Sequence, residues 1–141
     1  MYHQHHIDIA APPETIWPVL TDVEHWPDLT PSMNTVRLLD GTFEEGSRVR
    51  ITQPKLAPAI WRVTVVDPPH SFSWETSTFG MHVIANHRIE ATSAGSRLTL
   101  ELNATGLTAG IIGALSGPMT KRYVALEAEG IKRRVEAGPG A

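Results

Sequence analysis

Histidine is the residue type in this chain best suited to proton-transfer chemistry, because the 141 residues include seven histidines and no cysteine. The lack of cysteine excludes disulfides, thiolate metal sites and a cysteine nucleophile. His87 lies in the stretch "MHVIANHRI", where apolar residues occupy every second position. This alternation predicts a strand with His87 on its inward face. A neutral imidazole there could exchange a proton with a bound molecule, which makes His87 the one candidate catalytic residue.

A core role for His87 is the alternative, and we favour it. A general base needs a partner that orients it, but alternation places Glu75, Glu90 and Glu101 on the opposite face. A hydrogen bond to a neighbouring group or to water would also satisfy a buried imidazole. The sequence therefore shows no catalytic dyad.

Other patterns in the sequence give weaker indications of chemistry. His3, His5 and His6 look like part of a metal site, but zinc needs three or four ligands and the sequence offers no clear inward set to complete one. We interpret this segment as a frayed, solvated N-terminus and predict no metal and no cofactor. No serine lies in a GxSxG context, and "GTFEEG" lacks the lysine and following helix of a phosphate loop.

Large aromatic side chains form the other notable set. Trp61 and Trp74 lie on the inward faces of two strands adjacent in sequence, near the isolated polar residues Gln53 and Thr76. An apolar and aromatic surface with a few polar groups is typical of a small-molecule pocket, and equally of an ordinary core. From the residues alone we favour the ordinary core. Lys121 and Arg122 could meet an anionic head group at a cavity mouth, although two solvated helix charges explain them better.

The elements that must position these side chains follow from the period of the apolar residues. Residues 5–11 alternate, and six further segments with period two are separated by glycine- and proline-containing turns, which fits consecutive antiparallel hairpins. These segments are residues 34–39, 47–53, 59–66, 71–78, 81–92 and 96–105. Their predicted inward residues are Ile7, Ile9, Val36, Leu38, Val49, Ile51, Gln53, Trp61, Val63, Val65, Phe72, Trp74, Thr76, Met81, Val83, Ala85, His87, Ile89, Leu98, Leu100 and Leu102.

Helices are predicted at two places. Pro12 and Pro13 end the first strand, and Pro13 can begin a short helix; a second short helix, capped by Thr21 or Asp22, would end at Pro27 and Pro31. Near the C-terminus an apolar stripe at three- and four-residue steps predicts a long helix that Pro118 should kink or split. The stripe consists of Ile112, Leu115, Met119, Tyr123 and Leu126.

Composition limits the class of protein. The length suits one domain, which we place at residues 1–137 with a disordered tail at 138–141. The formal charge of −3 gives no general attraction to phosphate backbones, so nucleic acid is not an expected partner. We see no signal peptide and no apolar run long enough to span a membrane, and we expect a cytoplasmic protein without integral membrane association.

The order of strand, two short helices, six strands and long helix is that of the helix-grip fold. Residues 11–33, "APPETIWPVLTDVEHWPDLTPSM", resemble the opening of the polyketide cyclase/dehydrase branch of the START-like (SRPBCC) superfamily. "GSRVRITQP", "WRVTVVDPPHSFSW", "HRIEATSAGSRLTLEL" and "YVALEAEGIKRRVEA" are also similar to that family. The resemblance implies an α+β fold, in which a seven-stranded curved antiparallel sheet wraps around the C-terminal helix.

The resemblance also implies a cavity beneath the long helix, since the superfamily includes lipid carriers, hormone receptors, aromatase/cyclases and co-chaperones. We expect binding or transport of a small hydrophobic ligand, lipid-like or aromatic, and leave open a cyclase/dehydratase enzyme, an interaction module and a homodimer. The expected ligand-binding residues are Trp26, Gln53, Trp61, Trp74, Thr76, Phe79, Met81, His87, Met119 and Tyr123.

Overall fold

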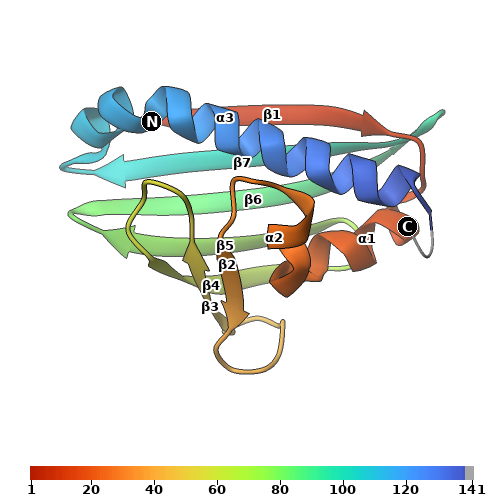
Figure 1. The fold of residues 1–141 in the computed structure, drawn as a ribbon, viewed down its shortest axis with the longest axis horizontal. Coiled ribbons are helices and arrows are strands. Elements are labelled where there is room, and N and C mark those ends of the chain that lie inside the picture. Colours follow the sequence, from red (N-terminus) through yellow and green to blue (C-terminus); the bar gives the residue numbers. More distant parts are fainter. Residues whose placement is uncertain (139–141) are drawn as a thin grey trace.

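The computed structural model describes residues 1–138, and its elements follow the predicted order (Figure 1). The strands are β1 (Tyr2–Ile9), β2 (Thr35–Leu38), β3 (Arg48–Thr52), β4 (Ala59–Asp67), β5 (Ser71–Thr78), β6 (Met81–Thr92) and β7 (Gly95–Gly106). The helices are α1 (Pro13–Thr21), the 3-10 turn η1 (Val23–His25), α2 (Trp26–Leu29) and α3 (Ala109–Glu136). Residues 139–141, part of the predicted tail, lie outside the described residues.

All seven strands form one antiparallel sheet in the order β1-β7-β6-β5-β4-β3-β2. Consecutive strands from β2 to β7 are neighbours, and β1 joins β7 at the opposite edge. The strands predicted after residue 34 agree with the observed ones to within one residue at each end. α3 crosses the sheet on the same side as α1 and α2 (Figure 1). The helix-grip prediction is therefore confirmed.

A bulge in β4 reverses the predicted inward orientation of Val65. Val63 pairs with Trp74, but the register shifts before Val65, and Val65 is 43% exposed. Val66 packs against the core in its place. An extra residue in one strand reverses the alternation beyond it, so the prediction that Val65 faces inward is wrong.

The prolines after β1 produce two short helical segments, as predicted, but with different boundaries. Pro13 occupies the first turn of α1, where its missing N–H costs no helical hydrogen bond. Pro27 lies at the start of α2, not at the end of a helix, and no side-chain cap was found before η1 or α2. At the start of α2 the indole of Trp26 turns inward, and its Nε1 donates to the Leu20 carbonyl of α1 at 3.1 Å.

The long helix α3 runs through Pro118 as one helix of 28 residues, so the predicted split does not occur. Its buried face is also shifted from the predicted one, because Leu115 is 82% exposed. The residues that α3 buries are Ala109, Gly117, Val124, Ala128, Gly130, Ile131 and Val135. A Cβ at Gly130 would lie 2.4 Å from the Leu29 carbonyl oxygen, which shows how closely α3 approaches α2.

The first strand is ordered to its beginning, which corrects the interpretation of a frayed N-terminus. β1 pairs with β7 from Tyr2 to Ile9, and the Met1 amino group donates to the Ala104 carbonyl at 2.9 Å. His3 lies on the inward side beside Gly117 of α3, and its Nε2 is buried without a partner among the described residues. The inward side of β1 therefore packs directly against α3.

Candidate functional site

A cavity lies between the concave face of the sheet and α3. It has a volume of about 70 Å³, counted as the space open to the centre of a water-sized sphere. A single water needs roughly 10–15 Å³ on that measure, so the cavity has room for a handful of waters or a small ring. Its lining consists of Met33, Ile51, Gln53, Leu56, Trp61, Trp74, Ala85, Asn86, His87, Leu100, Glu101, Leu102, Thr120, Tyr123, Val124 and Glu127.

Two periodicities bring this lining together. On the sheet, alternation directs Trp74 and His87 to the same face, and cross-strand pairing sets Trp74 opposite Ala85. On α3, Thr120, Tyr123 and Glu127 follow one another at three- and four-residue steps, so they share one side of the helix. An apolar wall with few polar groups is the usual composition of a ligand site.

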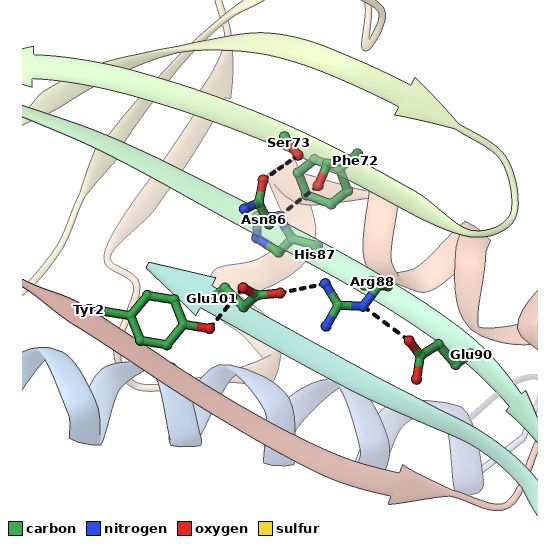
Figure 2. Close-up of polar contacts among 8 residues, drawn as sticks. All are labelled: Tyr2, Phe72, Ser73, Asn86, His87, Arg88, Glu90 and Glu101. Carbon is green, nitrogen blue, oxygen red and sulfur yellow. Dashed lines mark hydrogen bonds and ion pairs between the residues drawn. The ribbon is translucent and has the colours of Figure 1, made fainter. Parts of the chain in front are cut away.

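His87 belongs to the aromatic wall of the cavity. Its ring stacks on Phe72 with centroids 3.9 Å apart, and the Trp74 ring meets it edge-on at 5.4 Å. Its Nδ1 lies 3.2 Å from the Phe72 carbonyl oxygen (Figure 2), and since a carbonyl only accepts, Nδ1 carries the proton. Burial lowers the pKa of His87 to about 3. The imidazole is therefore neutral near pH 7 and a weak base.

Glu127 is the ionisable group that the sequence prediction missed. Among the described residues it forms no hydrogen bond or ion pair, and it borders the cavity from α3. The residue is half-buried, and the protein atoms packed around its carboxyl disfavour the charged form. This burial raises the pKa of Glu127 to about 8. Near neutral pH the cavity therefore contains a protonated carboxyl that can donate a hydrogen bond.

The loop between β3 and β4 closes against α3 at one end of the cavity. The Tyr123 hydroxyl donates to the Pro54 carbonyl at 2.7 Å, and Gln53 Nε2 donates to the Ser32 carbonyl at 3.1 Å. The first bond holds the loop in contact with α3, and the second ties the start of the loop to the segment between α2 and β2. The side-chain oxygen of Gln53 stays available as an acceptor. Lys121 and Arg122, which directly precede Tyr123 on α3, are exposed.

Five of the ten predicted ligand-binding residues border the cavity: Gln53, Trp61, Trp74, His87 and Tyr123. Trp26 lies behind the wall, 1% exposed, with its ring 5.4 Å from Trp74 and 5.8 Å from His87. Thr76 is buried and donates to the Ile60 carbonyl at 2.7 Å. These two side chains support the cavity wall rather than line it.

The other three predicted residues lie elsewhere. Met81 packs with a separate apolar cluster around Val83, and Met119 is half-buried outside the lining. Phe79 is 73% exposed, because the tight turn between β5 and β6 holds it at a positive φ of 49° at the end of the sheet. Three more exposed apolar residues, Leu107, Ile111 and Leu115, lie at the start of α3 and just before it.

Glu101 contributes no carboxylate to the cavity, although it appears in the lining. Its Oε1 pairs with Arg88, its Oε2 accepts a hydrogen bond from Tyr2 at 2.9 Å, and Arg88 also pairs with Glu90 at 3.2 Å. Figure 2 shows these four side chains on strands β1, β6 and β7, joined by contacts that do not include the His87 ring. The network confirms the alternation that assigns Glu90 and Glu101 to the outer face.

Residues 1–138 contain neither a cluster of metal-binding side chains nor a helix that could span a membrane. No group of three histidine, cysteine, aspartate or glutamate side chains in this range could hold a metal ion. No helix in it is both long enough and apolar enough to cross a membrane.

Comparison with known proteins identifies the family. Residues 3–136 match the family described as polyketide cyclase / dehydrase and lipid transport, so the chain belongs to that family, within the SRPBCC superfamily. No curated protein matches the sequence.

Solved structures share the fold at low sequence identity. The aromatase/cyclase Zhui from a Streptomyces species is similar with a TM-score of 0.80 and 18% identity, over 96% of this chain and 93% of that one. A Thermus thermophilus protein is similar with a TM-score of 0.79 and 16% identity, over 99% and 100% of the two chains. A Thalictrum flavum norcoclaurine synthase is similar with a TM-score of 0.72 and 18% identity, over 97% and 94%.

Proposed function

We propose that this protein binds a compact, largely apolar ligand in the cavity between the sheet and α3. The observation that carries the proposal is the lining itself, in which the Trp61 and Trp74 rings, with centroids 6.0 Å apart, lie among aliphatic side chains and a few polar groups. Burial of apolar area would supply most of the affinity, at about 25 cal/mol per Å².

The size of the cavity favours a ring-sized ligand over a long acyl chain. Sites for drug-sized ligands usually span roughly 300–1,000 Å³, against about 70 Å³ here. A long chain would need α3 or the β3–β4 loop to move outward, which would break the bond between Tyr123 and Pro54. We therefore expect benzyl alcohol and cyclohexanol to bind better than myristate.

A binding titration with a cavity-narrowing variant tests this proposal. Ala85 borders the cavity opposite Trp74, so Ala85→Leu should weaken benzyl alcohol binding at least about tenfold, as followed by tryptophan fluorescence. Ala91→Leu makes the same change at an exposed site on the same strand and should leave binding unchanged. Thermal unfolding checks that both variants are folded. Equal affinity in folded Ala85→Leu would show that the compound binds elsewhere.

A cyclase/dehydratase-type enzyme is the second candidate, and the two ionisable groups in one cavity favour it. His87 is too weak a base near pH 7, since efficient proton transfer needs a pKa near the working pH. Glu127 meets that condition and would act as the acid. Incubation of a linear polyketide-like substrate with wild type and Glu127→Gln tests this role. Equal product formation by both proteins would exclude Glu127 as the acid.

A further inference from the structure

The cavity has an uncompensated acidic group. None of its sixteen lining residues is a lysine or arginine. The Glu101 carboxylate is already paired with Arg88 on the outer face, and His87 is neutral. Within residues 1–138 Glu127 has no ion-pair or hydrogen-bond partner. A carboxylate removed from water is costly unless a positive charge or a hydrogen-bond donor compensates it. This site therefore lacks the group that would stabilise ionised Glu127.

We propose that the ligand carries a protonated amine that pairs with Glu127 while its apolar part lies against Trp61 and Trp74. This inference rests on the proposed binding function and names the class of ligand. An ammonium group would supply the counter-charge that the protein lacks, and the faces of tryptophan rings attract cations. A carboxylate ligand would meet an acidic group and no cation, so fatty acids and other anions are disfavoured.

Binding of the amine would displace a proton from Glu127 to solvent, with no covalent step. The free protein holds that proton at pH 7, since the pKa of Glu127 is about 8. Among the other titratable groups near this face of α3, His87 on β6 stays neutral and the Tyr123 hydroxyl is bonded to Pro54. On β1, His3 and His5 share the inward face, with His3 placed at Gly117. Glu127 is therefore the group we expect to release the proton.

Calorimetry with three matched single-ring compounds tests the inference. Benzylamine, benzyl alcohol and benzoate share a ring and differ in charge, so at pH 7 we expect benzylamine to bind at least about tenfold more tightly than the alcohol, and benzoate not to bind. Glu127→Gln should weaken benzylamine binding by about tenfold or more and change the alcohol by less than about threefold. Glu129→Gln, an exposed site on the same helix, should change neither.

The number of protons released gives a measurement that does not need the variant to fold. Titration in buffers of different ionisation enthalpy should show release of about 0.9 proton per benzylamine at pH 7, because a carboxyl with a pKa of about 8 is then about nine-tenths protonated. Tighter binding of the alcohol, or binding of the amine without proton release, would overturn the amine inference and leave the binding function intact. Failure of all three compounds to bind would overturn both.

Discussion

Replacement of Glu127 by glutamine should remove part of the fall in the free energy of unfolding that occurs as the pH rises. The carboxyl titrates at 4.5 in an unfolded chain and at about 8 in the folded protein. Between these values the unfolded state has released a proton that the folded state keeps. The unfolded state then binds fewer protons, so the free energy of unfolding falls as the pH rises from about 4.5 to about 8. Below this window the effect is absent, and above it the loss is complete.

The size of the loss follows from the shift in the pKa. Each pKa unit corresponds to about 1.36 kcal/mol, which sets an upper value of roughly 5 kcal/mol. Glu127 is half-buried and not fully removed from solvent, so its ionised carboxylate is partly screened and we expect roughly 2–4 kcal/mol. Glutamine is close in shape and does not titrate. Glu127→Gln should therefore match wild type at pH 4.5 and exceed it by roughly 2–4 kcal/mol at pH 9.

Urea unfolding of both proteins across pH 4.5–9 measures this difference, and subtraction of the two profiles removes the groups that they share. Glu129→Gln, two residues further along α3 and exposed, is the control and should follow the wild-type profile. Parallel profiles for wild type and Glu127→Gln would refute the reasoning, because they would mean that the Glu127 carboxyl is hydrated in the folded protein.

Three further substitutions test other parts of the structure. His87, with its pKa lowered to about 3, destabilises the folded protein as the pH falls below 6.5, so His87→Asn should lose less unfolding free energy than wild type between pH 7 and 4. Gly130→Ala should cost about 2–4 kcal/mol in urea unfolding, because the added Cβ would lie 2.4 Å from the Leu29 carbonyl oxygen. Tyr123→Phe removes the bond to the Pro54 carbonyl and should speed amide hydrogen exchange in residues 52–57 while β6 exchange stays unchanged.

The sheet was predictable from the sequence because its signals are local. Period-two alternation marks each strand, and glycines and prolines mark the turns, so residues 71–78 and 81–92 were placed with the bounds that β5 and β6 show. Val65 was misplaced because a bulge depends on how two strands pair, and alternation within one strand carries no record of it. Phe79 was expected in the cavity only from the family resemblance, and it lies instead in the turn between β5 and β6, outside the alternation of either strand.

The buried face of α3 was less predictable, and because that face was assigned incorrectly, Glu127 was not recognised as a cavity residue. Ile111 and Leu115 are exposed apolar residues in the first half of the helix, and including Leu115 in the apolar stripe shifted the predicted face. A usable signal was present nonetheless. Glu127 lies four residues after Tyr123 and four before Ile131, so it falls on the side of the helix that those residues occupy. Only the packing of the sheet against that side shows that the carboxyl has no partner.

The pKa shifts of the two ionisable groups in the cavity have the same cause, but they change the stability of the fold in opposite directions of pH. Removal from water disfavours the charged form of each, which lowers the pKa of His87 and raises that of Glu127. Protonation of the histidine destabilises the fold in acid, whereas ionisation of the glutamate destabilises it in base. A bound ammonium would remove only the second penalty. The stabilisation that an amine confers should therefore grow with pH while the amine stays charged, whereas a neutral ligand that accepts a hydrogen bond from Glu127 would stabilise less as the carboxyl ionises.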